Sequence, residues 1–399
     1  MAKDFRLLSH PDSLERIPLD DGGRRAGPLD AVLRATQLSD LLFKEGEQAD
    51  RETRITDRVH AALRASRLLL APFPARWGGE DLLSAERSRD LTAVLRLIGA
   101  GDLSVARLYE GHVNAVALVT RFGTSGQVAA FADAVAQGAM SAVWNAEGKQ
   151  PLRAQRTAAG WHLTGSKILA SGAGSITHPI VTPTGPDGVI MVIPVLASGE
   201  RADLSGWTAQ GVRSTATGTV DFTGLTIPFA AQIGGAGDYM RQPSFSGGAW
   251  RFCAVHLGAA ERLLDLYREH LVSRSRDGDA LQQQRVAHCA AALGSAAFWV
   301  EHAAARLASH SSVVDAVDAE ATVGFVNLTR IVTERACLDV LEAVHRGIGL
   351  GAFIRPHAVE RVSRDLSTYL RQPVPDGAML DAAKMVLASP RSTRQLWDL

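Results

Sequence analysis

The hydrophobic period of this chain changes twice, near Gly138 and near Gly247, and these changes constrain the fold more than any single motif. Up to about residue 137 the apolar residues recur mostly at helical spacing. Between the two glycines they form short β-branched or aromatic runs separated by glycine and proline, which is typical of strands. After Gly247 the helical period returns in long, alanine-rich segments. The chain is therefore predicted to be an α+β protein that is mainly α.

We expect helices before the first change at residues 29–43, 54–70, 86–97 and 101–123. We expect strands at residues 141–144, 160–165, 179–184, 189–195 and 218–222. Long helices suited to a bundle are expected at residues 249–272, 281–309, 319–345 and 356–370. The predicted domains are an N-terminal helical domain (1–137), a small middle β-domain (138–236) and a C-terminal helical bundle (237–399).

Composition excludes several classes of function. The 399 residues, 46% of them hydrophobic, are enough for two or three units with their own cores. Lys+Arg and Asp+Glu are both 42, and this balance gives no support for a nucleic-acid or anionic-membrane partner. Cys253, Cys289 and Cys337 lie far apart in apolar helical patterns, which indicates buried free thiols rather than disulfides or a metal site.

The first 25 residues lack a long apolar core, and no uncharged apolar run reaches the roughly 18 to 20 residues that a membrane span requires. We therefore expect no secretory signal, no membrane association and a cytoplasmic location.

Three alternate glycines, Gly347, Gly349 and Gly351, stand at the end of a helical pattern, and a proline-broken connector follows. A helix C-cap explains such glycines without a ligand. Close approach of the backbone to a ligand is the alternative. A new helix then carries the pair Arg364-Asp365. The order of these pieces resembles the C-terminal block of the acyl-CoA dehydrogenase superfamily, in which a "GGxG" loop touches the flavin and an "RD" pair precedes the catalytic glutamate.

The resemblance covers nearly the whole chain in order, with further anchors at residues 74–79, 123–127, 165–172 and 211–222. It implies an acyl-CoA dehydrogenase-like fold with an N-terminal helical domain, a small β-domain and a C-terminal four-helix bundle. It also implies FAD as the cofactor. The alternative is FMN, or reduced flavin that binds as a co-substrate. Family members share the flavin site across a subunit interface, so a homodimer or homotetramer is expected.

Several positions on the β-domain match the family's flavin-contacting strand ends. Ser171 stands where the family pattern "GxKxWITN" has its threonine, which keeps a hydroxyl donor. The following Gly172 makes this stretch more similar to the flavin-dependent monooxygenase branch; an ordinary turn is the alternative. Trp144 and Asn145 occupy the segment that lines the flavin, and an amide suits a flavin pyrimidine edge. The loop after Asn145 is shorter than the family's.

A second set of positions matches residues that reach a neighbouring subunit's FAD. The resemblance assigns Arg274 or Arg276 to the pyrophosphate, for which a bidentate guanidinium is suited, and Gln283 to the adenine part. His345 replaces a glutamine before the glycine loop, and Gly347 and Gly349 would approach the cofactor. A solvated charged loop is the alternative for the two arginines.

The family's catalytic glutamate is missing. Counting from Arg364-Asp365 places that position at about Pro373, and the alternative base position on the first bundle helix falls at about Trp250. Neither side chain accepts a proton, whereas abstraction of an α-proton from a thioester needs a base within hydrogen-bond reach. Asp376 and Glu110 are the candidate substitutes, and a surface charge is the plainer interpretation of each.

His112 lies in an otherwise apolar helix, and histidine is the natural proton donor near neutral pH. Its position matches an active-site histidine of the monooxygenase branch. A core histidine is the alternative.

These observations leave three functions open. The first is an FAD-dependent oxidoreductase acting on an acyl thioester such as an acyl-CoA, or on a related small organic substrate, with a displaced base. The second is a monooxygenase that uses O2 and reduced flavin from a reductase or electron-transfer partner, with Ser171 and His112 near the reacting oxygen. The third is a flavin- or acyl-binding protein without turnover.

Overall fold

The computed structural model describes residues 30–309, 316–371 and 373–396, so the expectation about a secretory signal lies outside the described residues. The α-helices are α1 (Ala31–Glu52), α2 (Asp57–Ala65), α3 (Ser88–Gly101), α4 (Leu103–Phe122), α5 (Ser125–Ala136), α6 (Ser244–Gly247), α7 (Trp250–Ser273), α8 (Ala280–Ala308), α9 (Ala316–Ile348), α10 (Ala358–Tyr369), α11 (Pro375–Ala388) and α12 (Thr393–Leu396). Short 3-10 turns are η1 (Ala75–Trp77), η2 (Arg213–Thr215), η3 (Phe229–Ala231), η4 (Asp238–Met240) and η5 (Gly349–Phe353).

The strands lie between α5 and α6. They are β1 (Val143–Trp144), β2 (Arg153–Thr157), β3 (Gly160–Thr164), β4 (Ser166–Ala170), β5 (Ile180–Val181), β6 (Thr184–Gly185), β7 (Gly188–Val189), β8 (Met191–Val192), β9 (Ala202–Asp203), β10 (Gly218–Asp221), β11 (Thr226–Ile227) and β12 (Gln232–Ile233). They form three small sheets in the orders β1-β5-β8-β12, β4-β10-β9 and β11-β3-β2-β6-β7. The longest pairing is the antiparallel β2–β3 hairpin.

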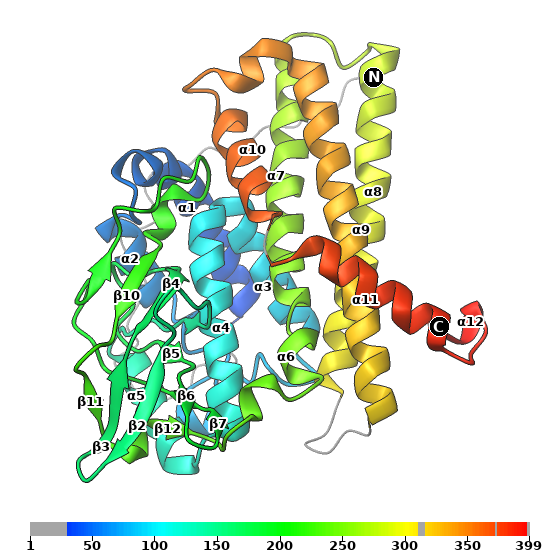
Figure 1. Ribbon diagram of the computed structural model, residues 1–399. Coiled ribbons are helices and arrows are strands. Elements are labelled where there is room, and N and C mark those ends of the chain that lie inside the picture. Colours follow the sequence, from blue (N-terminus) through cyan, green and yellow to red (C-terminus); the bar gives the residue numbers. More distant parts are fainter. Residues whose placement is uncertain (1–29, 310–315, 372, 397–399) are drawn as a thin grey trace, which may run out of the picture.

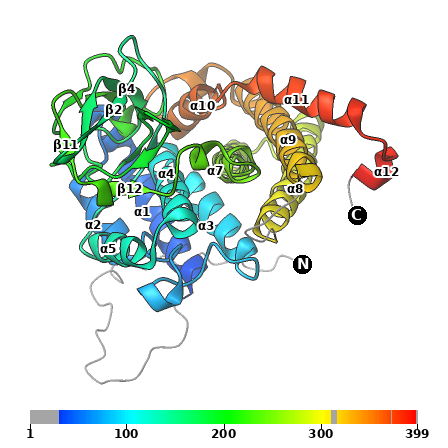
Figure 2. The same ribbon diagram turned by 60° about the horizontal axis from the view of Figure 1, so that its bottom comes forward.

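Figure 1 shows the strand region packed on one side of α4, with the long helices α7, α8 and α9 on the other side. In the turned view of Figure 2, α7 lies between α4 and the pair α8 and α9, while α11 crosses the outside of α9. The helix α10 packs against α7 and completes the bundle. The predicted fold class is therefore confirmed.

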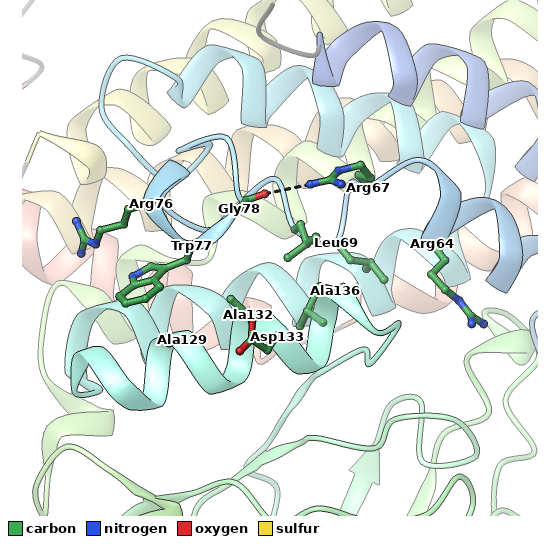
Figure 3. A pocket seen from close by; sticks show the side chains of 12 residues that line it. Arg64, Arg67, Leu69, Arg76, Trp77, Gly78, Ala129, Ala132, Asp133 and Ala136 are labelled. Atoms are coloured by element: carbon green, nitrogen blue, oxygen red, sulfur yellow. Dashed lines mark hydrogen bonds between the residues drawn. The ribbon is translucent and has the colours of Figure 1, made fainter. Parts of the chain in front are cut away.

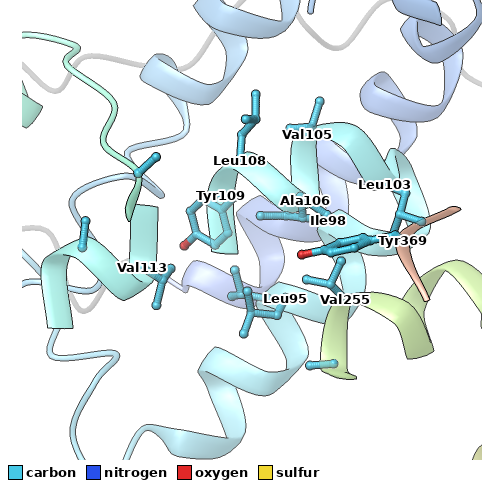
Figure 4. Close-up of a cluster of buried hydrophobic side chains, with 14 of the residues drawn as sticks. Leu95, Ile98, Leu103, Val105, Ala106, Leu108, Tyr109, Val113, Val255 and Tyr369 are labelled. Atoms are coloured by element: carbon cyan, nitrogen blue, oxygen red, sulfur yellow. The ribbon is translucent and has the colours of Figure 1, made fainter. Parts of the chain in front are cut away.

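The core is continuous where α3, α4, α7 and α10 meet. Figure 4 shows Leu95 from α3, Tyr109 from α4, Val255 from α7 and Tyr369 from α10, all of them buried. Each helix presents its apolar residues at the period of 3.6, and burial of that stripe supplies most of the helix's stability. The predicted burial of Cys253, Cys289 and Cys337 is confirmed, and burial raises the pKa of each thiol.

The Arg364-Asp365 pair ties three parts of the chain together. Arg364 contacts Asp50 at the end of α1 at 2.9 Å, and Asp365 accepts a 2.7 Å hydrogen bond from the backbone N–H of Val212 in the loop before η2. One turn earlier on α10, Arg361 donates to Asp102, the N-cap of α4, at 2.8 Å. We call Asp50, Asp102, Arg361, Arg364 and Asp365 the α10 cluster. It positions α10 against the N-terminal helices.

All four helices expected after Gly247 are present, with bounds close to those predicted. Helix α1 continues nine residues beyond the expected end at Phe43, to Glu52, and α2 is shorter than the expected helix at 54–70. The expected ranges do not include β2, β9, β11, β12, α5, α6, α11 or α12, and β4 was indicated only by the match of residues 165–172 to the family's strand pattern. No described helix is long and apolar enough to cross a membrane.

Candidate functional site

A cavity of about 1450 Å³ lies between the strand region and the helices. Its walls come from α4, from the segment that leads through α6 into α7, from α9 and from the end of α10 with the start of α11. The ends of β1 and β4 form one end of it, through Asn145, Leu169 and Ser171. Drug-sized ligands typically occupy pockets of about 300 to 1,000 Å³. The cavity is therefore large enough for a flavin ring and a small substrate together.

A buried lysine holds the strand end of the cavity in place. Lys167 is 0% exposed and donates to the backbone carbonyls of Asn145 at 3.1 Å and Thr182 at 2.9 Å. It also pairs with Glu147, which accepts a 3.0 Å hydrogen bond from the Leu152 N–H. The short loop after Asn145 is thus folded back on β4. Burial lowers the pKa of Lys167, and its partner Glu147 opposes that shift.

The sequence-predicted residues of the β-domain meet at this end, but not all of them face the cavity. Ser171 and Asn145 line it. The amide oxygen of Asn145 accepts a 2.8 Å hydrogen bond from the Thr182 hydroxyl, which fixes the orientation of the amide. Trp144 is buried, and its indole N–H donates to the Ser171 carbonyl at 2.9 Å. Trp144 therefore positions the Ser171 turn from behind.

Trp250 and Pro373 both line the same cavity. These are the two positions at which the family resemblance places the catalytic carboxylate. Trp250 is 3% exposed, and its indole N–H has no hydrogen-bond partner among the described residues. The carbonyl of Pro373 accepts a hydrogen bond from Arg330, which fixes the start of the segment before α11. The two non-basic residues thus line the cavity from α7 and from the α10–α11 connection.

Four polar residues from α4 and α7 form a connected group on the cavity wall, and we call them the cavity cluster. Arg107 donates to Glu110 at 2.8 Å, and Asn114 donates to the other oxygen of the same carboxylate. The amide oxygen of Asn114 accepts a 2.9 Å hydrogen bond from Arg251. Burial lowers the pKa of Arg251 to about 10, although the charge of Glu110 opposes the shift. Glu110 is 2% exposed and is the buried carboxylate on this wall.

The environment of His112 contradicts a role as proton donor in the cavity. The ring is 0% exposed, and no part of it lines the cavity. One ring nitrogen is 2.8 Å from the Leu69 carbonyl, and the other accepts from the Ser141 N–H at 3.2 Å. Both nitrogens are thus used by the backbone, and burial lowers the pKa of His112 to about 4. His112 is a core histidine that joins α4 to two loops.

Asp376, the other candidate substitute base, does not lie in the cavity. It lies in the first turn of α11, is exposed and does not line the cavity, although its neighbours Gly377 and Ala378 do. A position in the first turn of a helix accounts for the carboxylate, since it interacts favourably with the helix dipole. Glu110 is the only one of the two proposed substitute bases that lines the cavity.

The second set of predicted cofactor residues gathers at the far end of the bundle. Arg274, Arg276, Gln283, His345, Gly347 and Gly349 lie where α7 ends, α8 begins and α9 ends, and none of them lines the cavity. Trp250 begins α7, whose 24 residues are about 36 Å long. The cavity at the start of this helix is therefore far from the predicted cofactor residues at its end. Figure 1 shows this end of the bundle at the top, away from the strands.

At this end the side chains bond mainly to their own chain. Arg276 donates to the Gly347 carbonyl at 3.1 Å, and Gln283 donates to the Asp277 carbonyl at 3.0 Å. The ring of His345 lies 4.5 Å from that of Phe353, and burial lowers the pKa of His345. Arg274 is exposed at the end of α7.

The two glycines of the loop have different requirements. A Cβ at Gly347 would lie 2.1 Å from the Tyr267 hydroxyl, so this position needs glycine for packing within the chain. Gly349 has a φ of +79° and open space where a Cβ would stand. Glycine is required there for its backbone conformation. Neither requirement depends on a ligand.

A second, smaller pocket of about 550 Å³ lies between η1 and α5. Figure 3 shows Arg64 and Arg76 pointing away from one another, while Arg67 donates to the Gly78 carbonyl at 3.4 Å. The arginines do not converge on one point. None of the predicted catalytic or cofactor residues lines this pocket.

Sequence reasoning missed most of the cavity cluster and Leu169. Arg107, Glu110 and Asn114 stand at positions i, i+3 and i+7 of an otherwise apolar helix, so they share one face. That spacing of polar residues was the available signal. Leu169 is 55% exposed with a φ of +51°, a conformation that is uncommon for a side chain with a Cβ. No sequence pattern predicts a positive φ at a leucine.

Comparison with known proteins agrees with the geometry. Residues 250–371 match the family described as acyl-CoA dehydrogenase, C-terminal domain. The match covers most of the C-terminal bundle, and the resemblance to the acyl-CoA dehydrogenase superfamily predicted from the sequence is confirmed.

Individual relatives are distant. The chain is 24% identical over 219 residues to mitochondrial isobutyryl-CoA dehydrogenase of Bos taurus, a match that spans 51% of this chain and 50% of that protein. Dibenzothiophene monooxygenase (TdsC) from Paenibacillus sp. A11-2 superposes with a TM-score of 0.80 at 20% identity, covering 90% of this chain and 97% of its own. Another structure of TdsC contains FMN. Methanesulfinate monooxygenase MsuC from Pseudomonas fluorescens gives a TM-score of 0.79 at 18% identity, covering 92% and 100%. These likenesses show the fold.

Proposed function

We propose that this protein is a flavin-dependent oxidoreductase of the monooxygenase type, acting on a small organic substrate in the 1450 Å³ cavity. The observation that carries the proposal is that Trp250 and Pro373, at both positions of the family's catalytic carboxylate, line this cavity. A bound reduced flavin would supply two electrons to O2, with one oxygen atom going to the substrate and the other to water. This chemistry needs no carboxylate at either position. Names of the structural neighbours TdsC and MsuC support the same reaction class.

The strand end of the cavity fits a flavin ring. Ser171 offers a hydroxyl and Asn145 an amide whose orientation Thr182 fixes. Leu169 places an exposed apolar side chain on the same wall, where it would exclude water from a bound ring. Both FMN and FAD carry the isoalloxazine ring that these residues would hold. Either form is open, since the family resemblance implies FAD whereas TdsC is solved with FMN.

The residues at the far end of the bundle take part only if two chains share the cofactor. Arg274 is the exposed guanidinium of this set, and Leu350, Phe353 and Ile354 beside it are exposed apolar side chains. A second copy of the chain placed on this end would cover them. We therefore propose a homodimer or homotetramer. A cytoplasmic location is also part of the proposal.

The second candidate is a dehydrogenase in which Glu110 replaces the missing base. In its favour, Glu110 is buried on the cavity wall. Against it, Arg107 and Asn114 both bond to the carboxylate, and such contacts stabilise the ionised form but also occupy the oxygens that would take the proton.

Anaerobic reduction and reoxidation separate these candidates. The flavin-loaded protein is mixed without oxygen with isobutyryl-CoA and butyryl-CoA, and in a second experiment it is photoreduced and mixed with O2. We expect no reduction of the flavin by either thioester, and reoxidation kinetics that differ from those of free reduced flavin. Rapid reduction by a thioester that is lost in Glu110→Gln establishes the dehydrogenase instead. Asp376→Ala is the matched control, because this carboxylate is exposed and outside the cavity.

Failure to bind flavin in either redox state, measured by equilibrium titration with oxidised flavin and, without oxygen, with reduced flavin, would overturn the proposal for both reactions. The third function, binding without turnover, would be indicated by retained flavin that O2 reoxidises no differently from free flavin and that no thioester reduces.

A further inference from the structure

The helical wall of the cavity carries more positive than negative charge. The basic residues that line the cavity are Arg107, Arg121, Arg251, Arg330, Arg371 and Lys384, and the acidic ones are Glu110, Glu320 and Asp381. Glu110 is paired with Arg107. Arg251 contacts Asn114, while Arg330 contacts Asn327 and the Pro373 carbonyl. Among the described residues no carboxylate is within ion-pair distance of Arg251 or Arg330. Neither cation has an ion-paired carboxylate, although the charge of Glu110 acts on Arg251, and those of Glu334 and Asp381 act on Arg330, from farther away.

Arg251 is the clearest of the two. It is 8% exposed, and its Nε has no hydrogen-bond partner among the described residues. Burial of a cation without a paired anion is unfavourable because the desolvation cost is not offset, and a bound anion would offset it. Gly248 leaves room for this guanidinium, since a Cβ there would lie 2.8 Å from the Arg251 Nη1. The absence of a side chain at residue 248 therefore allows the buried Arg251 guanidinium to lie at the cavity wall.

Aromatic rings stand beside the cavity cations. The guanidinium of Arg251 lies 5.4 Å from the centre of the Trp250 ring, and that of Arg330 lies 5.4 Å from the Phe252 ring. The indole N–H of Trp250 is a second buried donor without a partner. A cation and an unpartnered N–H donor side by side match a ligand that presents several acceptor oxygens. The ring faces match an apolar or aromatic remainder.

We propose that the substrate is an organic anion, and that Arg251 binds its carboxylate, sulfinate, sulfonate or phosphate group while the apolar part of the substrate packs against Trp250 and Phe252. This inference rests on the proposed function in taking the cavity as the substrate site. The same anionic chemistry is also present in the phosphate of a flavin nucleotide, so the experiment separates the two sources.

Calorimetry with matched probes tests the proposal on the flavin-loaded protein. Benzenesulfonate carries the anion, and methyl phenyl sulfone is its neutral analogue. We expect the wild type to bind benzenesulfonate at least tenfold more tightly than the sulfone, and Arg251→Gln to lose about tenfold to a hundredfold of the sulfonate affinity. Arg251→Lys retains part of it, because the charge remains while the fork geometry is lost. Arg335→Gln is the control: Arg335 is an exposed arginine of α9 that pairs with Asp339.

Two results would overturn the inference. One is equal affinity of the wild type for the sulfonate and the sulfone. The other is a loss in Arg251→Gln that appears for FMN but not for riboflavin or the sulfonate, which would assign the cation to the cofactor phosphate. Arg251→Lys and thermal melts of each variant guard against misfolding as the cause. Sulfonate binding through Arg251 in a protein that binds neither oxidised nor reduced flavin would leave this inference standing and remove the proposed function.

Discussion

The α10 cluster and the cavity cluster are both buried networks of arginine and acidic residues, but their charges are arranged differently. In the α10 cluster each guanidinium has a carboxylate partner: Arg361 contacts Asp102, and Arg364 contacts Asp50 and Glu360. In the cavity cluster the single carboxylate of Glu110 pairs with Arg107, and Arg251 is connected to it only through Asn114. The first network is complete within the chain, whereas the second leaves a cation for a ligand.

This difference separates a structural from a functional role better than burial does. The residues of both networks are largely buried, yet only the cavity cluster faces an open volume. A buried ion pair that is broken by removing one partner leaves an uncompensated charge, whereas removing a charge that is already uncompensated removes its desolvation cost. The two networks are therefore expected to respond to mutation in opposite ways.

The largest effect is expected for Asp102→Ala. This change strands Arg361 as a buried cation and removes the N-cap of α4, where Asp102 accepts from the N–H groups of Ser104 and Val105. We expect the free energy of unfolding, measured with urea, to fall by about 3 to 5 kcal/mol. Asp339→Ala is the control, because its pair with Arg335 is exposed and contributes about 1 kcal/mol or less. Similar losses in the two variants would show that the α10 cluster is not an essential network.

The next effect is a dependence of the free energy of unfolding on pH, to which Asp365 of the α10 cluster contributes. Burial and the charge of Asp102 raise the pKa of Asp365 to about 7. A carboxyl whose folded pKa lies above its unfolded value of about 3.9 stabilises the fold fully when protonated, below pH 3.9. That stabilisation is lost as the pH rises from about 4 to 7.

Asp365→Asn should remove this slope, since asparagine stays neutral and its amide oxygen can still accept from the Val212 N–H. We expect the stability of the variant relative to the wild type to rise by up to about 1.4 kcal/mol per pH unit between pH 4 and 7. Comparison of the two proteins cancels the opposite contribution of His112, which loses stability as pH falls from 6.5 towards 4. A difference that stays constant with pH would contradict the raised pKa.

The fold was predictable because its long helices carry a clear period. The four helices after Gly247 were located from that period alone, and the colinear anchors supplied the family. Strand β2 was missed because only Ala154 of its five residues is buried, so it has no apolar alternation. Strand β4 was indicated by the family pattern at residues 165–172 and not by its hydrophobic period, because a charged residue, Lys167, takes one of its buried positions. Its charge is satisfied by partners on other segments, which the local pattern does not reveal.

The site was predictable only where the family order fixes it. Ser171, Asn145, Trp250 and Pro373 were placed by that order, and the structure brings all four to one cavity. His112 was misjudged because its two partners, at residues 69 and 141, are backbone groups distant along the chain. The contact of Arg251 with Asn114 joins residues 137 positions apart, so no local pattern contains it. Contacts of this kind are determined by tertiary packing.

The smallest effect on stability is expected for a change at Arg251, the residue at which we expect the largest effect on anion binding. Arg251→Met removes a buried cation without a carboxylate partner, and methionine keeps apolar contact with Trp250. The lost hydrogen bond to Asn114 and the relieved desolvation cost oppose each other, so we expect the free energy of unfolding to change by about 1 kcal/mol or less. Arg361→Met, the matched change in the α10 cluster, strands Asp102 and should cost about 3 kcal/mol or more. Urea unfolding of both variants measures the difference. Equal losses would mean that Arg251 is compensated within the chain, and the distinction between a complete network and one that awaits a ligand would not hold.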